Sequence, residues 1–427
     1  MNIHFHTLGC KVNQYETEVM REGFLKCGYT ADESVGADAV IINSCTVTAE
    51  SDKKTRQLVR RCRRENPQAV IVLTGCMVQA FPESAENLSE ADIVIGNRDV
   101  SKIITALQNF DKDRYFCVEE HKNGDLYNTP SISNFSERTR AFMKIQDGCD
   151  RFCTYCIIPY ARGRVRSRDL KSIYKEAENL AANGYSEVVL VGINLTSYGK
   201  GEEFDLCDAV DTVCRVDGIK RVRLGSLEPD HISDEMLNRL KAQPKFCPQF
   251  HLSLQSGCDE TLKRMNRHYD SAFYADLVAR IRNIFQNSAI TTDIMVGFAG
   301  ETEDEFNKSL EFAKKIGFAR AHIFAYSVRS GTVAAGLKNQ VSSSDKQKRA
   351  HLMAQVTQQT ETEFLTNQVG AVYPVLFETQ ENNTAEGYTP NYTRVVVNTD
   401  KNFTGQIKNV YLKSVNGDCC IGEIIDT

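Results

Sequence analysis

The sequence predicts an α/β protein with three parts: an N-terminal open parallel α/β sheet, a central partial (β/α)6 barrel and a C-terminal small β-barrel. Three changes of pattern predict this architecture. Short β-rich runs alternate with helical patterns up to about residue 110, a longer alternation begins near residue 140, and strands with turns replace it after residue 370. We therefore expect domains at 1–115, 139–366 and 367–427, with a polar linker at 116–138.

The elements of the first domain follow from their local patterns. Parallel strands need a crossover between them, so the alternation of strand and helix indicates a parallel sheet. In the linker, Asn123-Gly124 and Thr129-Pro130 are turn signals, and the segment has room for a hairpin. The expected strands are 3–7, 39–42, 69–73 and 93–95, and the expected helices are 51–64 and 100–110.

The second domain has six strand candidates, which are too few for a closed eightfold barrel, so an open or partial barrel is expected. Ser342 is a capping residue at the start of one long polar helix that runs to about residue 366. The pattern beyond it indicates a small β-barrel. The strand candidates are 141–145, 187–191, 221–224, 250–254, 290–296 and 321–326 in the second domain, and 373–378, 393–397 and 407–412 in the third.

Composition limits the possible functions. The 427 residues are 41% hydrophobic and 25% charged, which is typical of a globular protein and excludes a disordered or fibrous one. No apolar run is long enough to span a bilayer, and residues 1–6 lack the features of a signal peptide, so we expect a cytoplasmic protein without membrane contact. Thiols stay reduced there, so the 15 cysteines indicate metal ligands and packing residues rather than disulfides. Because the net charge is −5, any nucleic acid must be bound by local basic patches.

Three cysteines stand close together directly after the first strand of the second domain. Cys149, Cys153 and Cys156 have the spacing C-x3-C-x2-C. Structural zinc requires four ligands, and the nearest histidines, His121 and His231, are far away in sequence. Three thiolates leave one iron of a four-iron cluster without a protein ligand, and a small molecule with an amine and a carboxylate can chelate that iron.

Three more cysteines, Cys10, Cys45 and Cys76, each lie just beyond an expected strand of the first domain. Because the carboxyl ends of parallel strands share one edge, a second site with three cysteines is expected there. The alternative is that a small cysteine suits a tight corner. We interpret the others as packing residues: Cys27, Cys62, Cys117, Cys207, Cys214, Cys247, Cys258, Cys419 and Cys420.

The motif at residues 149–156, with Tyr155 as the aromatic residue of its last spacer, resembles the radical S-adenosylmethionine superfamily. This resemblance implies that Cys149, Cys153 and Cys156 hold a 4Fe-4S cluster. The open iron of this cluster binds S-adenosylmethionine, and one electron cleaves the sulfonium to a 5′-deoxyadenosyl radical. The cofactor then carries the chemistry, and the protein places it.

Residues 7–16 (TLGCKVNQYE), 42–48 (INSCTVT) and 75–79 (GCMVQ) resemble the N-terminal domain of methylthiotransferases. In that family an auxiliary 4Fe-4S cluster, a radical domain and a small β-barrel called TRAM follow one another, and all three parts match here in order. The resemblance implies that Cys10, Cys45 and Cys76 hold the auxiliary cluster, which carries the sulfur. It also implies a transferase with tRNA (the anticodon stem-loop), an electron donor such as flavodoxin and a sulfur source as partners.

Residues 146–149 (QDGC), 156–163 (CIIPYARG) and 223–229 (RLGSLEP) are similar to the branch that adds a methylthio group to C2 of N6-threonylcarbamoyladenosine at position 37 of tRNA. The isopentenyladenosine branch typically has Gln-Met where this chain has Lys11-Val12, and a third branch modifies a ribosomal-protein aspartate. These two remain alternatives, as does a non-catalytic, metal-stabilised RNA-binding protein. The chain departs from the family at Ala299 and Ala325, where relatives usually have Pro.

Two further sets of candidate residues complete the predicted site. Polar residues after the later strands are candidates for cofactor contacts, and basic or aromatic patches are candidates for RNA contacts. An arginine run at 60–64 is as consistent with a solvated helix face as with phosphate binding. The cofactor candidates are Tyr155, Gly192, Asn194, Glu228, Ser253, Gln255 and Asp293; the RNA candidates are Arg162, Arg164, Arg166, Arg168, Lys263, Arg264, Arg267, Tyr388, Tyr392 and Arg394.

Overall fold

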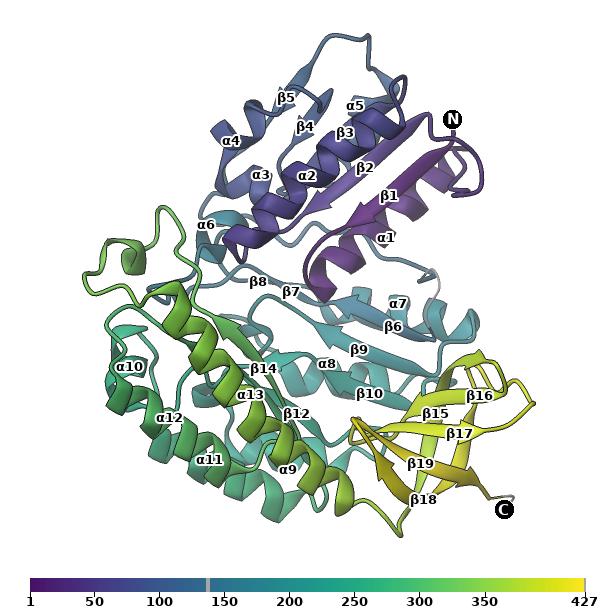
Figure 1. The fold of residues 1–427 in the computed structure, drawn as a ribbon. Coiled ribbons are helices and arrows are strands. Elements are labelled where there is room, and N and C mark those ends of the chain that lie inside the picture. Colours follow the sequence, from purple (N-terminus) through teal and green to yellow (C-terminus); the bar gives the residue numbers. More distant parts are fainter. Residues whose placement is uncertain (136–138, 426–427) are drawn as a thin grey trace.

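The computed structural model describes residues 1–135 and 139–425 (Figure 1). The N-terminal domain is a five-stranded parallel sheet of order β1-β2-β3-β4-β5. The sequence predicted four of these strands. The fifth lies across the expected boundary between the first domain and the linker and pairs with β4, whereas no hairpin is present among the described residues of the linker. The strands are β1 (Ile3–Thr7), β2 (Ala39–Ser44), β3 (Val70–Gly75), β4 (Ile93–Ile95) and β5 (Tyr115–Cys117).

Helices cover both faces of this sheet, which is why all six residues of β2 are buried. Phe5 and Ile41 face the core that is shared with the second domain, while Val40 and Ile42 face a separate core together with Val59 of α2. The helices are α1 (Lys11–Lys26), α2 (Ala49–Glu65), α3 (Cys76–Ala80), α4 (Pro82–Glu86) and α5 (Lys102–Gln108).

The second domain is the expected partial barrel, built from two parallel sheets of order β10-β9-β6 and β11-β12-β13-β14. Its third strand is interrupted at Gly225, so β10 and β11 continue each other from one sheet into the next. The strands are β6 (Arg140–Lys144), β9 (Glu187–Val191), β10 (Arg221–Leu224), β11 (Ser226–Leu227), β12 (Gln249–Leu252), β13 (Ala289–Val296) and β14 (Arg320–Ala325), with a small ribbon of β7 (Gln146–Asp147) and β8 (Arg166–Ser167).

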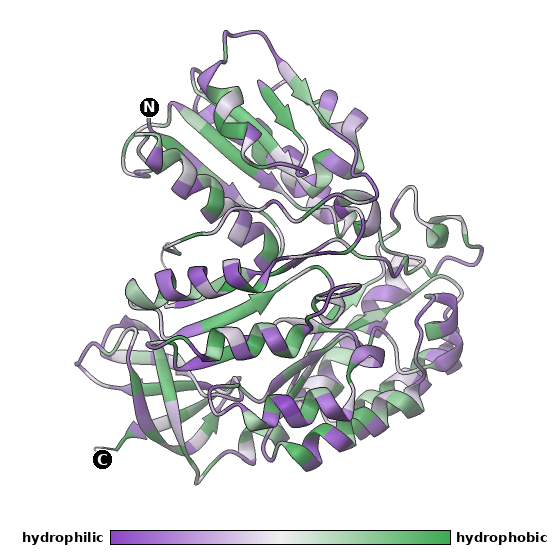
Figure 2. Cartoon of the chain, turned by 180° about the vertical axis from the view of Figure 1, so that it is seen from behind, coloured by the Kyte–Doolittle hydropathy of each residue, from purple (hydrophilic) through white to green (hydrophobic). Residues whose placement is uncertain are grey.

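Helices pack on the outside of the partial barrel, and its apolar strands form the interior (Figure 2). The last helix, α13, begins after Ser342, whose hydroxyl accepts a hydrogen bond from the backbone N–H of Asp345. The helices are α6 (Ile158–Arg162), α7 (Leu170–Ala182), α8 (Leu206–Cys214), α9 (Asp234–Ala242), α10 (Asp259–Arg264), α11 (Ser271–Ile284), α12 (Glu303–Ile316) and α13 (Ser343–Thr366).

The third domain is a closed five-stranded barrel of order β15-β16-β17-β19-β18. The sequence did not predict β16 and β19, because each contains a glycine, Gly387 and Gly422, that weakens the strand pattern. Gly387 is needed there, since a Cβ would lie 2.3 Å from the carbonyl oxygen of Leu376. The strands are β15 (Val372–Glu381), β16 (Thr384–Tyr388), β17 (Arg394–Asn398), β18 (Ile407–Asn416) and β19 (Cys419–Ile424).

Candidate metal centres and the buried charges between them

The loop of Cys149, Cys153 and Cys156 follows β7 at the rim of the partial barrel. Gly148 makes the turn into it with φ +74°, and a Cβ at this position would lie 1.8 Å from the carbonyl oxygen of Arg164. Only glycine fits this corner without moving the backbone.

N–H groups point at two of these sulfurs. Cys149 Sγ accepts hydrogen bonds from the backbone N–H of Arg151 at 3.5 Å and from Asn194 Nδ2 at 3.8 Å. Cys153 Sγ accepts one from Arg267 Nη1 at 3.3 Å. Such donors stabilise negative charge on sulfur, which suits thiolates that bind a metal.

Cys10, Cys45 and Cys76 lie together at the edge of the N-terminal sheet, as their positions after three parallel strands predicted. Asn13 Oδ1 lies 3.8 Å from Cys10 Sγ and 3.9 Å from Cys76 Sγ. A Cβ on Gly9, which has φ +106°, would lie 2.9 Å from Cys45 Sγ. Cys10 is exposed, whereas Cys45 and Cys76 are buried.

Burial disfavours the charged form of these thiols. It raises the pKa of Cys76 to about 12, and it raises the pKa of Cys149 to about 11 and that of Cys156 to about 12. Neighbouring cysteines of the same set raise these pKa values further. Metal binding must therefore displace protons from the buried sulfurs.

The described residues contain no group of three or more His, Cys, Asp or Glu side chains that could hold a single metal ion. Three thiolates of a 4Fe-4S cluster bind three different irons, so they need not converge on one point. The sulfur-only donor sets and the N–H groups aimed at them thus fit two such clusters. Cys149, Cys153 and Cys156 would hold one, and Cys10, Cys45 and Cys76 the other.

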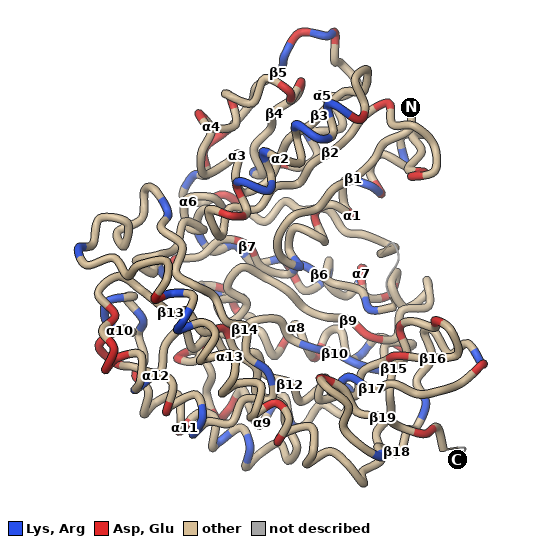
Figure 3. The backbone as a smooth tube through the Cα atoms, in the orientation of Figure 1, with Lys and Arg blue, Asp and Glu red and all other residues tan. Residues whose placement is uncertain are grey.

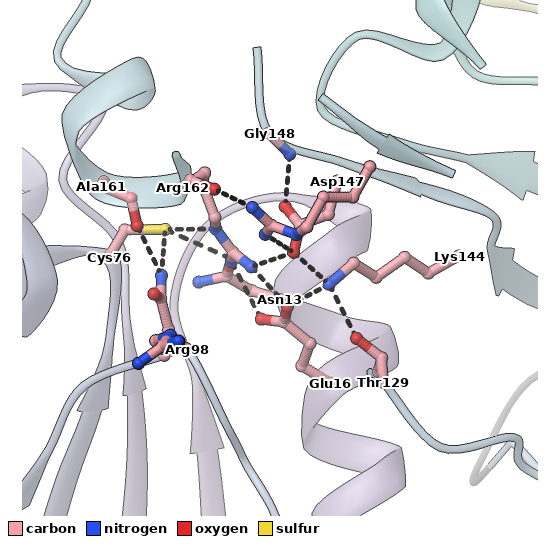
Figure 4. A network of polar contacts seen from close by, with 12 residues as sticks. Asn13, Glu16, Cys76, Arg98, Thr129, Lys144, Asp147, Gly148, Ala161 and Arg162 are labelled. Carbon is pink, nitrogen blue, oxygen red and sulfur yellow. Dashed lines mark hydrogen bonds and ion pairs between the residues drawn. The ribbon is translucent and has the colours of Figure 1, made fainter. Parts of the chain in front are cut away.

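A network of buried charges connects Cys76 with residues that flank the loop of Cys149, Cys153 and Cys156 (Figure 4). Arg162, with no exposed side-chain surface, donates from Nε to Cys76 Sγ at 3.1 Å. Its Nη2 donates to Glu16 Oε2 and to Asn13 Oδ1, both at 2.9 Å. Lys144 Nζ lies 2.7 Å from both Glu16 Oε1 and Asp147 Oδ2.

The charges in this network do not balance. Arg166 joins it through Nη2, which lies 3.2 Å from Asp147 Oδ2. Three cations, Lys144, Arg162 and Arg166, thus face two carboxylates, Glu16 and Asp147. Burial acts to raise the pKa of Glu16, but Arg162 and Lys144 lower it below its ordinary value, so both acids are ionised. The surplus positive charge lies against Cys76, where an anionic sulfur would neutralise it.

The same helix connects the two sites. α6 begins two residues after Cys156 and ends at Arg162, and it packs against α3, which begins at Cys76. One short helix therefore follows the first cysteine set along the chain, and its last side chain, that of Arg162, contacts Cys76 of the second set.

The structure corrects the expected RNA-facing role of several arginines. Arg162, Arg166 and Arg168 have side chains that are 0%, 8% and 2% exposed, so they lie inside the protein. Arg168 pairs with Glu176 at 2.7 Å. The sequence placed these arginines beside the cysteine loop but gave no sign that they point inward. Glu16 is 146 residues from Arg162 along the chain, and the pairing of Arg168 with the nearby Glu176 depends on how α7 packs.

Other RNA candidates also have partners within the chain. Arg267 pairs with Glu228 at 2.5 Å and Arg264 with Glu305 at 2.5 Å. Arg394 pairs with Glu386 at 2.6 Å on the surface of the small barrel. Of the basic candidates, Lys263 and Arg164 are exposed, with Arg164 3.6 Å from Asp150 and stacked on the ring of Phe152.

Tyr388 and Tyr392 do not present open faces for a base. Their rings stack on each other with centroids 4.7 Å apart, and the guanidinium of Arg140 lies 5.0 Å from both centroids. Arg223 lies 4.7 Å from the Tyr392 centroid. These tyrosines therefore dock the small barrel onto the second domain.

The cofactor candidates surround the cysteine loop. Asn194 donates a hydrogen bond to Cys149 Sγ. Glu228 accepts one from Arg267, which in turn donates to Cys153 Sγ. The carbonyl oxygen of Ser253 accepts a hydrogen bond from Arg267 Nη2 at 3.1 Å, and Gln255 has φ +68°. Tyr155 lies within the loop itself, where its ring contacts that of Phe298. Asp293 lies 3.2 Å from His251, and Gln146 Oε1 lies 2.7 Å from where a Cβ on Gly192 would be.

A basic groove on the N-terminal domain is the feature that sequence analysis left undecided. It has a volume of about 720 Å³ and lies between α2, whose cations are blue in Figure 3, and the end of β1. Its floor includes Thr7 and Leu8, so it ends two residues before Cys10. The cations that line it are Lys54, Arg60, Arg61 and Arg64.

Comparison with known proteins agrees with this architecture. A model of the radical SAM superfamily matches residues 143–313, and one described as Uncharacterized protein family UPF0004 matches residues 2–96. The radical S-adenosylmethionine methyltransferase TsrM of Kitasatospora setae has a similar fold, with a TM-score of 0.57 and 14% identity over 76% of this chain and 74% of that one. The fold and the cysteine loop define the chain as a radical S-adenosylmethionine protein.

The relatives narrow the class further. The threonylcarbamoyladenosine tRNA methylthiotransferase MtaB of Bacillus subtilis is 39% identical, covering 96% of this chain and 93% of that protein. MtaB of Thermotoga maritima is 37% identical, covering 88% of this chain and 86% of that protein. A tRNA-2-methylthio-N(6)-dimethylallyladenosine synthase of Clostridium botulinum is 34% identical, covering 98% of this chain and 96% of that protein. The chain belongs to the methylthiotransferase family, and it is an enzyme that transfers a sulfur-containing group.

Proposed function

We propose that the enzyme adds a methylthio group to C2 of N6-threonylcarbamoyladenosine at position 37 of tRNA. The observation that carries this proposal is the pair of three-cysteine sets on either side of α6, in a chain that matches relatives named MtaB over almost its whole length. Those relatives are 35–39% identical, against 34% for the dimethylallyladenosine synthases. The dimethylallyl (isopentenyl) nucleoside is the second candidate substrate.

The residues around the cysteine loop prepare its chemistry. When bound there, a 4Fe-4S cluster with S-adenosylmethionine supplies the radical that activates an aromatic C–H bond. Arg267 Nη1 donates a hydrogen bond to Cys153 Sγ and would stabilise negative charge on that sulfur. Arg267 is itself oriented by Glu228 and by Tyr269, whose hydroxyl lies 3.0 Å from Arg267 Nε. Asn194 orients Cys149 in the same way. These side chains keep the sulfurs in place and desolvated.

Four further expectations belong to this proposal. The basic groove supports binding of the RNA backbone, because four cations line it and its floor includes Leu8, two residues before the exposed Cys10. A flavodoxin-like electron donor and a separate sulfur source supply the reaction, which takes place in the cytoplasm. Among residues 1–135 and 139–425, no helix could serve as a membrane-spanning segment.

The test uses the anaerobically reconstituted enzyme with two RNA hairpins that differ only at position 37, one with threonylcarbamoyladenosine and one with isopentenyladenosine. We expect about eight irons per chain and methylthiolation of the first hairpin. Changing Cys149, Cys153 and Cys156 together to Ala is expected to halve the iron and abolish the reaction. Cys247→Ala, at a buried cysteine outside both sets, is the matched control. Exclusive reaction with the second hairpin would replace the proposed substrate by the alternative.

A further inference from the structure

Lys11 has a position that none of the roles above uses. It directly follows Cys10, the exposed cysteine of its set, and begins α1. Neighbouring Cα atoms are about 3.8 Å apart, so a group bound at Cys10 lies within reach of the long lysine side chain. Residue 11 is exposed, and its Nζ lies 5.8 Å from the ring centroid of Phe142 on β6.

Lys11 is a cation without a counter-charge. Among the described residues it forms no ion pair, and the first turn of α1 contains no acid. The Lys11 ammonium therefore has no carboxylate partner among the described residues, and an incoming anion would be attracted to it.

The proposed substrate carries an anion at the corresponding place. C2 and N6 of adenine flank N1 on the same Watson–Crick edge, so a group that reaches C2 from the Cys10 side lies beside the substituent on N6. A threonylcarbamoyl substituent ends in a carboxylate, whereas a dimethylallyl one has no charge. A lysine ammonium pairs with such a carboxylate through a charge-assisted hydrogen bond.

We propose that Lys11 Nζ binds the threonyl carboxylate of the target nucleoside and thereby selects this nucleoside over one with an uncharged N6 substituent. The inference rests on the proposed function and deepens it by assigning the recognition of the N6 group to one residue. Lys11 acts on the substrate here, not on the cysteine-bound centre.

The test compares a hairpin carrying threonylcarbamoyladenosine with the same hairpin carrying its methyl ester, which removes only the negative charge. Binding is measured by fluorescence anisotropy on the reconstituted enzyme, and the initial rate of methylthiolation is measured alongside. We expect the wild type to prefer the acid by about tenfold in both measurements, as one charge-assisted hydrogen bond predicts. Lys11→Met should bind acid and ester equally, and Lys11→Arg should keep the preference.

A matched control separates this contact from general RNA affinity. Lys54→Met, in the basic groove, should weaken binding of the acid hairpin and of the ester hairpin by the same factor and leave the ratio of the two affinities unchanged. Lys11→Met must retain the wild-type iron content and its affinity for a hairpin with plain adenosine. Equal binding of acid and ester by the wild type, or an unchanged ratio in Lys11→Met, would overturn the inference.

The two proposals fail in different ways. If the wild type methylthiolates the acid and the ester at equal rates, the assignment of Lys11 is wrong while the proposed function stands. If the wild type modifies neither, the proposed function fails, and the anisotropy ratio still decides whether Lys11 recognises the carboxylate.

Discussion

Arg162 joins the two cysteine sets because its guanidinium contacts Cys76 while its backbone belongs to the helix that follows Cys156. Replacing it by methionine would leave Glu16 with Lys144 as its remaining close cation in a buried site. Removing one partner of a buried ion pair costs about 3–5 kcal/mol. We therefore expect Arg162→Met to lower the free energy of unfolding by about that amount and to reduce iron bound at the N-terminal set.

Arg164→Met is the matched control for this prediction. The Arg164 side chain is 53% exposed, and its contact with Asp150 is loose, so its replacement should change the unfolding free energy by less than about 1 kcal/mol. Denaturant unfolding of the metal-free proteins and iron analysis of the reconstituted ones check both variants. Equal losses in the two variants would contradict the role given to Arg162.

His121 introduces a pH dependence. Burial, followed by the charge of Arg166, lowers the pKa of this histidine to about 4, below the ordinary value of 6.5. The unfolded chain therefore binds a proton below pH 6.5 that the folded chain does not, and stability falls as the pH drops from 6.5 towards 4.

The measurement compares the free energy of unfolding of the wild type and of His121→Gln at pH 7.5 and pH 5. The wild type should lose about 2 kcal/mol more than the variant between these pH values. His351→Gln, on the α13 surface where residue 351 is exposed, is the control and should follow the wild type. If His121→Gln lost as much unfolding free energy between pH 7.5 and pH 5 as the wild type, His121 would not be the group that causes this pH dependence.

At the scale of elements, four of the cations on α2, Lys54, Arg60, Arg61 and Arg64, line the basic groove. Lys54 and Arg64 form no ion pair among the described residues, and the pairs of Arg60 and Arg61, with Glu90 and Glu65, are 3.3 and 3.8 Å long. These cations are thus available to RNA phosphates.

We expect Lys54→Glu combined with Arg64→Glu to weaken hairpin binding and to reduce the slope of log affinity against log salt by about two. Lys314→Glu, at an exposed position on α12, makes a control with similar local exposure. Affinity measured at several salt concentrations gives the slope, and an unchanged slope in the double variant would place the RNA elsewhere.

Periodicity was sufficient to predict the strands that are buried on both faces, such as β2 and β9, because a short apolar run between two helical segments is typical of a central parallel strand. It did not predict β5, whose residues are half exposed, or β16, which contains Gly387. Spacing likewise predicted that Cys10, Cys45 and Cys76 meet at one edge. The inward direction of Arg162 could not be predicted, because it depends on Glu16, which lies 146 residues away along the chain and is brought near only by folding.

At the scale of the whole molecule, one buried acid of β9 organises the docking of the small barrel. Glu187 accepts a hydrogen bond from Arg223 Nε at 3.0 Å and lies 3.5 Å from Arg221 Nη1. These arginines in turn donate to backbone carbonyls of the barrel, Arg221 at Tyr388 and Arg223 at Pro390. The orientation of the barrel therefore depends on a carboxylate in another domain.

Glu187→Gln should loosen this contact, because an amide cannot balance the surrounding guanidinium groups. We expect faster amide hydrogen exchange at residues 388–394 and unchanged exchange in α11. Glu386→Gln removes a surface partner of Arg394 and should leave both regions as in the wild type. Protection at residues 388–394 that survives Glu187→Gln would indicate that ring stacking alone holds the barrel.

The unbalanced charges around Arg162 also bear on how such a chain can change during evolution. If the first domain were separated from the rest by fission of the gene, Lys144, Arg162 and Arg166 would keep Asp147 but lose Glu16, and the shared apolar core would be cut. Neither half would be a good starting point for recombination with foreign partners. The two cysteine sets are therefore expected to be inherited together, as one indivisible module.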